Sequence, residues 1–180
     1  MLEDLKMMIT RLLLLLIFYT VLIGCTSIPE NINPVTGFDE NRYLGKWYEI
    51  ARLDHAFERG LSHVTAEYHL RSDGGIEVTN RGFSNTENKW REASGKAYFV
   101  GKRNTGHLKV SFFGPFYSSY IIFDLDKDDY RYAYVTGYNK SFLWFLSREP
   151  IVSPSVKERF VQKSRELGFE TDALIFPVQH

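Results

Sequence analysis

From Trp47 onward the chain is a succession of short apolar-rich segments, about 10 to 15 residues apart and separated by turn signals. Val64–Leu70 alternates strictly between apolar and polar residues, which is the pattern of a strand with one buried face. The Asp-Gly-Gly sequence at 73–75 then predicts a hairpin turn, because glycine tolerates positive φ. No stretch with a helical period of useful length lies between these segments, so alternating βα units and a parallel nucleotide-binding sheet are excluded.

Eight strands are expected from this pattern. They are Trp47–Arg52, Val64–Leu70, Ile76–Phe83, Glu92–Val100, His107–Phe113, Tyr120–Leu125, Tyr132–Thr136 and Leu143–Ser147. Eight strands in simple succession predict an all-β fold, either an antiparallel up-and-down barrel or a sandwich. The interior of an eight-stranded barrel is filled by side chains or holds one small ligand. The aromatic content of 16% suits strands or the lining of a cavity.

One amphipathic α-helix is expected after the strands. Pro154 lies near its start, and Gly168 fits the position just past its end. Its apolar face consists of Val156, Phe160, Val161 and Leu167. We expect a last short strand, Leu174–Val178, to pair at the seam of the barrel.

The N-terminus has the pattern of a secretory signal peptide, which we assign to residues 1–24. Leu12–Ile23 is an apolar run of 12 residues that follows two basic residues, Lys6 and Arg11. A membrane-spanning helix needs about 20 such residues, so this run is too short for one. The start of translation stays open between Met1, Met7 and Met8.

The run ends in Leu-Ile-Gly-Cys, which resembles the lipobox of bacterial lipoproteins. The resemblance implies cleavage after Gly24 and attachment of acyl chains, palmitate among them, to Cys25. Thr26 follows where an aspartate would favour the inner membrane, so the resemblance implies the outer membrane, with the protein facing the periplasm. As the chain has one cysteine, a disulfide framework within the chain is excluded.

The segment after Cys25 predicts a tether. Residues 26–37 carry two prolines and several polar residues without an apolar period. The domain organisation expected is therefore a signal peptide at 1–24, a lipidated N-terminus and tether at 25–38, and a barrel domain at 39–180.

Composition and charge exclude several classes of function. With 22 basic and 22 acidic residues the net charge is zero, which excludes strong electrostatic attraction to nucleic acid. The sequence contains no G-x-S-x-G, P-loop or G-x-G-x-x-G motif. His63 and His69 share a strand face but lie about 20 Å apart, too far to chelate one ion. We expect no catalytic residue, no metal and no cofactor.

Three short motifs, in order along the chain, resemble the signatures of the lipocalin family. Gly45 and Trp47 form a G-x-W sequence on the first strand. Asp129 and Tyr130 resemble the second motif, between the sixth and seventh strands, although an aspartate precedes them where threonine is usual. Leu143–Arg148 resembles the third motif, whose arginine closes the last strand. The sequences WYEIARLDHAFERG and FFGPFY are similar to bacterial outer-membrane lipocalins, a group near apolipoprotein D.

The resemblance implies an eight-stranded antiparallel up-and-down lipocalin barrel with one C-terminal helix. It also implies that the Arg148 guanidinium lies across the Trp47 ring at the closed end, a contact worth about 0.5–2 kcal/mol. Gly45 would let the entering turn approach the strand closely. We interpret Gly45, Trp47, Asp129, Tyr130 and Arg148 as structural residues and not as ligand contacts.

The same resemblance implies that the protein holds or transports a fatty acid or a lysophospholipid. Burial of an acyl chain drives such binding, at roughly 0.8 kcal/mol per methylene group before ordering costs. The candidate lining residues are Ala66, Tyr68, Val78, Ala97, Phe99, Val110, Phe112, Ile122, Tyr134 and Trp144. A register slip of one residue would turn a whole strand's set outward. Two alternatives stay open: a lipid-modifying enzyme on the same barrel, and a structural surface lipoprotein without ligand.

Two aromatic groups have no single interpretation. Phe112–Tyr117 contains four aromatic residues, which predict core packing at a tight turn, an aromatic lip at the barrel mouth or a homodimer surface. Tyr130, Tyr132 and Tyr134 share one strand face, which is either the cavity side or the outer face of the sheet.

Overall fold

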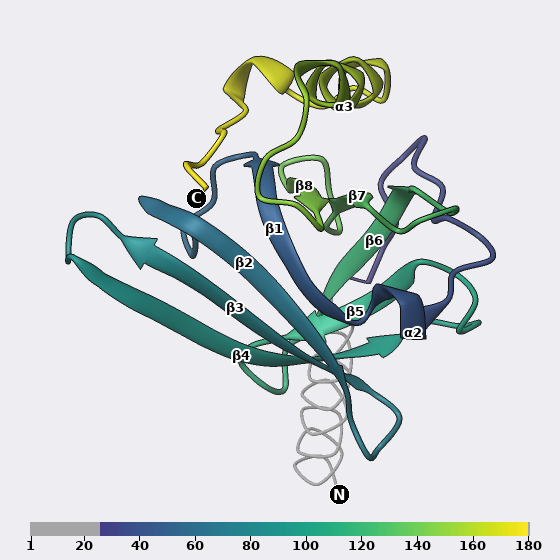
Figure 1. The fold of residues 1–180 in the computed structure, drawn as a ribbon. Helices are drawn as coiled ribbons and strands as arrows, with labels where there is room; N and C mark the ends of the chain where they lie inside the picture. Colours follow the sequence, from purple (N-terminus) through teal and green to yellow (C-terminus); the bar gives the residue numbers. More distant parts are fainter. Residues whose placement is uncertain (1–25, 180) are drawn as a thin grey trace, which may run out of the picture.

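The computed structural model describes residues 26–179, which form a closed barrel of eight antiparallel strands (Figure 1). The strands are β1 (Gly45–Arg52), β2 (Leu61–Leu70), β3 (Ile76–Ser84), β4 (Lys89–Phe99), β5 (His107–Ser111), β6 (Ser118–Leu125), β7 (Tyr132–Thr136) and β8 (Leu143–Ser147). Each strand pairs with its neighbours along the chain, and β1 also pairs with β8, which closes the barrel. The predicted fold class is confirmed.

The strand limits differ from the sequence prediction by up to three residues, with β2 beginning at Leu61 instead of Val64 and with further differences in β4 and β5. β4 begins at Lys89, three residues earlier than expected, and pairs with β3 as far as Ser84. Residues 89–94 are exposed, so they lack the alternation that marks a half-buried strand. β5 ends at Ser111, and the expected last two residues, Phe112 and Phe113, belong to the loop before β6.

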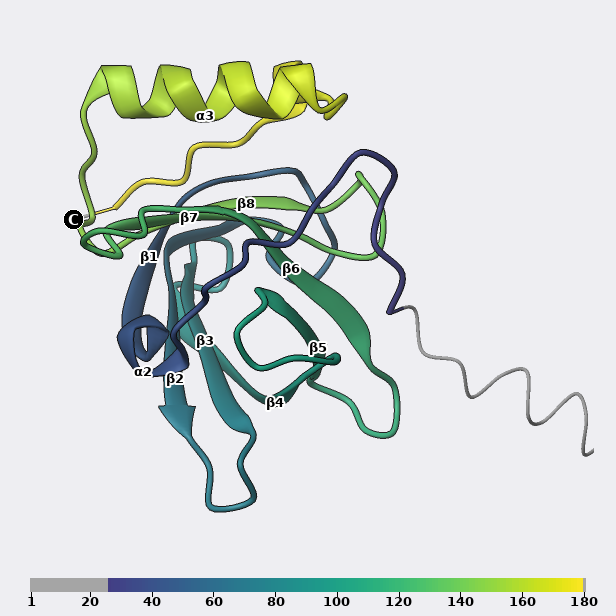
Figure 2. The same ribbon diagram turned by 90° about the vertical axis from the view of Figure 1, so that its right-hand side faces the viewer.

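Two helices flank the barrel. The short α2 (Glu40–Tyr43) precedes β1, and the Asp39 side chain caps it by accepting a hydrogen bond from the Asn41 amide. α3 (Pro154–Glu166) lies across the outside of β7 and β8 (Figure 2). Phe160 of α3 is fully buried, and Gly168 ends the helix with a φ of +81°. The predicted C-terminal helix is therefore present with its expected apolar face.

The predicted closing strand at 174–178 is absent. A 3₁₀ turn, η1 (Thr171–Ala173), is followed by an extended segment in which only Ile175 forms a bridge, to Arg52 of β1. The two backbone hydrogen bonds of this bridge measure 2.9 and 2.8 Å. Pro177 has no amide hydrogen to donate, which limits any longer ladder.

The predicted tether at 26–37 is instead docked on the barrel. The Val35 amide donates to the Ile122 carbonyl oxygen at 2.9 Å, and the Gly106 amide donates to the Val35 carbonyl oxygen at 2.8 Å. Thr36 forms a bridge with Thr105, and Ile32 is buried. These contacts use backbone groups, which leave no signature in composition, and this is why the segment resembled a linker.

The apolar side chains form two clusters on opposite faces of the sheet. The interior core lies inside the barrel and includes Trp47, Tyr68, Ile122 and Val135. The outer core lies between the barrel wall and α3 and includes Ile121, Tyr134, Phe145 and Phe160. Within residues 26–179, no helix combines the length and apolar character needed to span a membrane.

Candidate functional site

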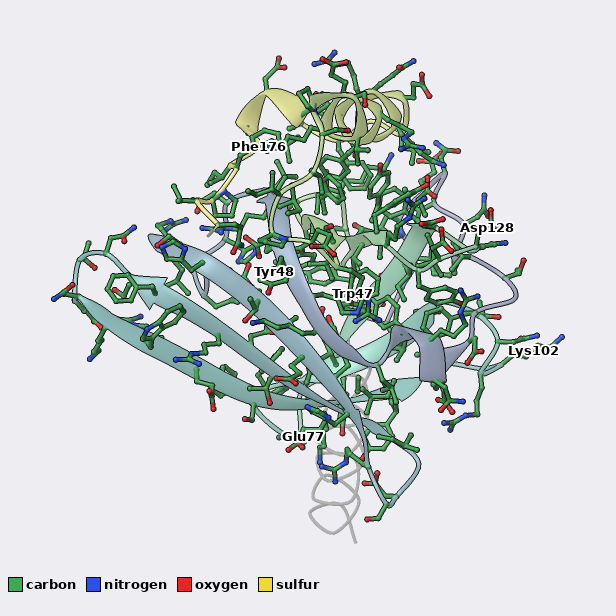
Figure 3. All side chains as sticks on the ribbon, in the orientation of Figure 1. Trp47, Tyr48, Glu77, Lys102, Asp128 and Phe176 are labelled. Atoms are coloured by element: carbon green, nitrogen blue, oxygen red, sulfur yellow. The ribbon has the colours of Figure 1, made fainter. Side chains whose placement is uncertain are left out.

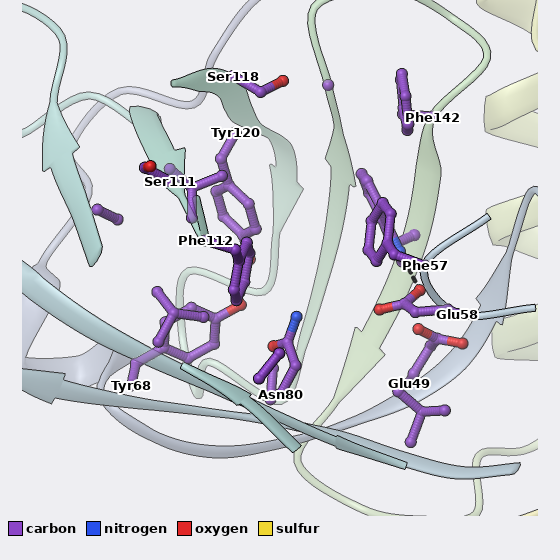
Figure 4. Close-up of a pocket in the computed structure, with 18 of the residues that line it drawn as sticks. Glu49, Phe57, Glu58, Tyr68, Asn80, Ser111, Phe112, Ser118, Tyr120 and Phe142 are labelled. Carbon is purple, nitrogen blue, oxygen red and sulfur yellow. Dashed lines mark hydrogen bonds between the residues drawn. The ribbon is translucent and has the colours of Figure 1, made fainter. Parts of the chain in front are cut away.

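The barrel contains a cavity of about 640 Å³ (Figure 4). Its walls come from the strands and are mostly hydrocarbon, and its mouth is bordered by the β1–β2, β5–β6 and β7–β8 loops. In an up-and-down barrel these loops lie at the same end, which we call the open end. The opposite, closed end carries α2 and the β2–β3, β4–β5 and β6–β7 loops. The cavity has the size and lining of a site for a small hydrophobic ligand, since such pockets measure about 300–1,000 Å³.

Seven of the ten lining residues expected from the sequence border this cavity. They are Ala66, Tyr68, Val78, Ala97, Val110, Phe112 and Trp144. They come from β2, β3, β4, β5 and β8 and from the loop after β5. On these strands, the face that the sequence predicts to be buried points into the cavity.

The other three expected lining residues lie elsewhere. Phe99 packs near the closed end, with its ring centroid 6.0 Å from that of Phe38. Ile122 is fully buried in the interior core and does not border the cavity. The expectation for Tyr134 is wrong, because its side chain faces the outer core, 4.9 Å from Phe160 between ring centroids.

Several lining residues were missed by the sequence prediction. The apolar ones include Leu61, Val64, Ile76, Leu108 and Leu146. Val64 belongs to the same alternating face as Ala66 and Tyr68, so the alternation of apolar and polar residues is enough to predict its place in the lining. The polar ones, Glu49 and Glu58, had no such signal, because a carboxylate is not expected in an apolar wall.

Three tyrosine hydroxyl groups meet inside the barrel, toward the closed end. The Tyr120 hydroxyl oxygen lies 2.7 Å from that of Tyr43 and 2.8 Å from that of Tyr68. Burial raises the pKa of all three phenols, so they stay neutral. The three hydroxyls satisfy one another and separate the closed-end core from the cavity.

A cluster of polar side chains interrupts the apolar wall beside β1. The side chains of Glu49 and Glu58 are buried and border the cavity together (Figure 4). Arg52 Nη1 donates to Glu49 Oε1 at 2.5 Å, and Arg52 Nη2 donates to the Glu58 carbonyl oxygen at 2.9 Å. Trp144 Nε1 donates to Glu58 Oε2 at 3.0 Å, and His55 Nε2 lies 2.9 Å from the same oxygen.

The two carboxyl groups of this cluster differ in protonation. Burial raises the pKa of Glu49 well above its ordinary value, and the nearby charge of Glu58 raises it further. Burial also opposes ionisation of Glu58, but the contacts with His55 and Trp144 outweigh it and lower the pKa of Glu58. When the pair holds a single proton, these shifts in pKa favour Glu49 as its carrier and leave the negative charge on Glu58. The cavity thus offers a polar ligand group both a hydrogen-bond donor and an acceptor.

The closed end is held by Trp47, which is labelled in Figure 3, and by Arg148. The guanidinium carbon of Arg148 lies 3.9 Å from the centroid of the fully buried Trp47 ring, the arrangement implied by the family motifs. Arg148 also donates to the carbonyl oxygens of Arg42, Leu44 and Lys46, at 2.7, 2.9 and 2.8 Å.

The remaining motif residues lie at the same end. Gly45 has a φ of +87°, and a side-chain carbon there would lie 3.6 Å from an Arg148 nitrogen. The Tyr130 hydroxyl accepts a hydrogen bond from the Asp39 amide at 2.9 Å, and Arg42 covers its ring at 4.2 Å. Asp129 lies in the β6–β7 loop, 3.5 Å from Arg131. None of these five motif residues borders the cavity.

Across residues 26–179, no three acidic, histidine or cysteine side chains gather closely enough to hold a metal ion. Cys25 and the signal peptide at 1–24 lie outside the described residues.

Known proteins similar to this chain identify its family by sequence and its fold by structure. Residues 38–179 match the lipocalin-like domain. A Vibrio cholerae protein named outer membrane lipoprotein Blc is 54% identical over 169 residues, which cover 94% of this chain and 99% of that protein. Its Escherichia coli namesake is 45% identical over 161 residues, covering 88% and 90% of the two chains. Insecticyanin from the tobacco hornworm Manduca sexta shares the fold, with a TM-score of 0.67 at 20% identity over 86% of this chain and 87% of that one. The chain therefore belongs to the lipocalin family, and its near relatives there are bacterial outer-membrane lipoproteins.

Proposed function

We propose that the protein is a membrane-anchored carrier that holds a fatty acid or a lysophospholipid in its barrel. The observation that carries this proposal is the cavity of about 640 Å³, which is mostly apolar and opens at one end. A barrel filled by its own side chains would leave no such space, which argues against the structural alternative.

The cavity lining suits a ligand with an acyl chain and a polar head. Hydrocarbon side chains such as Val78, Val110 and Leu108 offer a surface to the chain, at roughly 0.8 kcal/mol per buried methylene group before ordering costs. The Glu49–Glu58 pair offers hydrogen bonds to the head, which would fix the orientation of the ligand.

Acylation of Cys25 after removal of residues 1–24 supplies the anchor in this proposal. Its support is the lipobox-like sequence that ends at Cys25 and the lipoprotein names of the bacterial relatives. Several acyl chains on one residue hold a protein stably at a bilayer, and we expect the protein on the periplasmic face of the outer membrane. Radioactive palmitate should label the wild type and not Cys25→Ser, and globomycin should shift the size of the wild type. An unlabelled wild type would contradict the anchor.

Tryptophan fluorescence tests ligand binding. Trp144 borders the cavity, whereas Trp47 is buried at the closed end and Trp90 is half exposed on β4. Titration with palmitic acid or lysophosphatidylethanolamine should therefore give a saturable change that Trp144→Phe strongly reduces. Lipid extracted from protein purified out of its own membrane should contain the bound species. No saturable change and no co-purified lipid would contradict the proposal.

A matched pair of substitutions on β3 locates the binding site. Val78 points into the cavity, and its neighbour Thr79 lies on the opposite face of the same strand. Val78→Trp fills part of the cavity and should weaken binding by about tenfold or more, equivalent to about 1.4 kcal/mol. Thr79→Trp should leave binding unchanged. Equal affinities for the two variants would place the ligand elsewhere.

The enzyme alternative finds little support in the one serine–histidine contact near the cavity. Ser119 Oγ lies 3.5 Å from His107 Nε2. However, Ser119 Oγ donates to the Ser27 carbonyl oxygen at 2.9 Å, so its proton points away from the imidazole. The hydrogen bond from Ser119 to Ser27 holds the N-terminal segment against the barrel, and His107 does not activate the Ser119 hydroxyl as a nucleophile. We therefore propose binding without catalysis.

A further inference from the structure

The N-terminal segment reaches the barrel at its open end. Ser119 Oγ, at the start of β6, donates to the Ser27 carbonyl oxygen at 2.9 Å. Ser27 Oγ donates to the carbonyl oxygen of Tyr138, in the β7–β8 loop, at 3.3 Å. Both Ser119 and Tyr138 border the cavity. Cys25 is two residues before Ser27, and two residues of chain span at most about 7 Å, so a lipid on Cys25 would start within that reach of Ser27.

Three phenylalanine rings are exposed around the same mouth. Phe113 and Phe116, in the β5–β6 loop, are 81% and 70% exposed, and Phe57, in the β1–β2 loop, is 57% exposed. All three also border the cavity. Single exposed apolar side chains are ordinary on a protein surface, but a group around one opening marks a contact surface.

Several of the charged side chains near this mouth form ion pairs with one another. Arg59 and Asp54, in the β1–β2 loop, lie 2.7 Å apart. In the β3–β4 hairpin, Glu87 pairs with both Lys89 and Arg91. A rim of exposed aromatic rings with paired charges fits the boundary between lipid headgroups and acyl chains better than an oppositely charged protein.

We propose that the open end of the barrel rests on the bilayer that anchors Cys25, with Phe57, Phe113 and Phe116 in contact with lipid. The proposal rests on the acylation of Cys25 proposed above. It commits to a lipid bilayer as the partner, because Ser27, two residues after the proposed acylation site, is bound at this rim.

This orientation gives the ligand a path between bilayer and cavity without passage through water. An acyl chain that crosses water exposes its methylene groups, at a free-energy cost that grows with the length of the chain. A mouth in contact with lipid removes much of that barrier, so exchange of ligand with the bilayer should be fast.

Fluorescence quenching by lipid measures the orientation directly. The full-length lipidated protein carries the substitution Phe116→Cys, and the new thiol is labelled with an environment-sensitive fluorophore. The protein is bound to vesicles of phosphatidylethanolamine and phosphatidylglycerol. These vesicles also contain lipids with a spin label on the acyl chain, which quench the fluorophore on contact. Because Cys25 is acylated, the new thiol is the one that reacts. Leu70→Cys is the matched control, since Leu70 is also exposed but ends β2 at the closed end. We expect several-fold stronger quenching of the label at 116 than at 70.

The outcomes separate this proposal from the anchor on which it rests. Failure of the protein to float with vesicles would overturn both. Flotation with equal quenching at the two positions, or stronger quenching at 70, would overturn the orientation alone. An unquenched label at 116 that transfers energy to a second labelled copy would assign the rim to a homodimer and overturn the lipid contact.

The rate of ligand exchange provides a second readout. The double variant Phe113→Ser and Phe116→Ser should take up a fluorescent lysophospholipid from vesicles several-fold more slowly than the wild type. Leu70→Ser should match the wild type. Equal rates for all three proteins would overturn the role of the rim, and the thermal unfolding of each variant checks that it is folded.

Discussion

The two ends of the barrel use their aromatic side chains in opposite ways. At the closed end, the Trp47 ring is fully buried and lies beneath the guanidinium of Arg148, which also donates to three carbonyl oxygens. At the open end, Phe113 and Phe116 expose most of their rings and make no comparable core. The polar groups of the closed end are satisfied by the chain itself, whereas the open end leaves apolar surface for something outside it.

Stability and ligand exchange depend on different ends of the barrel. A buried ring under a satisfied guanidinium contributes to the free energy of unfolding, and its loss leaves unpaired carbonyl groups. Exposed rings contribute little to that free energy, so we expect them to function in contact with a ligand or a surface. We expect substitutions at the closed end to change stability and substitutions at the open end to change the exchange of ligand.

Arg148→Ala should give the largest effect on stability. It removes three hydrogen bonds and the cation–π contact with Trp47, which together stabilise the fold by about 2–4 kcal/mol. The melting temperature should fall by roughly 5–12 °C. The melting temperature of Arg148→Lys should lie between those of the wild type and Arg148→Ala, because lysine keeps the charge but lacks the planar group. Arg131→Ala is the control, since Arg131 is exposed and water screens its ion pairs with Asp126 and Asp129. An unchanged melting temperature for Arg148→Ala would refute the structural role.

Tyr120→Phe should give the next largest effect. The change leaves the buried hydroxyls of Tyr43 and Tyr68 without their shared partner, at a cost of about 1–2 kcal/mol. Chemical denaturation should detect the loss, while Tyr117→Phe on the half-buried rim should change stability by less than about 0.5 kcal/mol. Equal effects at the two tyrosines would mean that the boundary between closed end and cavity is not held by hydrogen bonds.

The sequence predicts the cavity well where one face of a strand meets water. β2 and β3 alternate cleanly, so the residues expected inside on these strands, such as Ala66 and Val78, border the cavity. β7 has apolar residues on both faces because α3 covers its outer side. Ala133 and Val135 point inward there, and Tyr134, the larger residue, packs outward against α3. Period-two reasoning cannot choose between two buried faces.

The chain outside the strands was harder to predict for a different reason. Val35 and Ile175 hold their segments to the barrel by backbone hydrogen bonds, which any residue other than proline can make. Glu49 and Glu58 border an apolar cavity because Arg52, His55 and Trp144 satisfy them, and this partnership depends on the folded β1–β2 loop. By contrast, the Trp47–Arg148 contact followed from short motifs whose residues the family resemblance already linked.

Glu49, which borders the cavity, should make the stability of the protein depend on pH, whereas the tyrosines toward the closed end should not. Burial raises the pKa of Glu49 above its ordinary 4.5, so the folded protein holds a proton that the unfolded chain releases. This contribution is complete below that ordinary value and is lost as the pH rises through the folded pKa. Glu49→Gln keeps a donor toward Glu58 but cannot ionise, so its stability should fall less between about pH 5 and about pH 8.

Urea unfolding of the wild type and of Glu49→Gln across this pH range measures how the free energy of unfolding of each protein changes with pH. Glu58 acts with the opposite sign, because its pKa is lowered and its contribution is lost as the pH falls, and it is present in both proteins. The phenols of the closed end stay neutral throughout, so Tyr120→Phe serves as a control with the slope of the wild type. Identical slopes for Glu49→Gln and the wild type would show that Glu49 is already ionised in the folded protein.

Phe113→Ser should give the smallest change in stability, although it removes a whole aromatic ring. Since the ring is 81% exposed, little apolar area returns to water on unfolding, and the free energy of unfolding should change by less than about 0.5 kcal/mol. A burial of this ring in a homodimer would instead make the wild-type melting temperature rise with protein concentration, and Phe113→Ser would abolish that rise. A concentration-independent melting temperature, together with slower lipid exchange by the rim variant, assigns the ring to the membrane. The contrast between the ends then holds in full, because one buries its aromatic rings for the fold and the other exposes them to lipid.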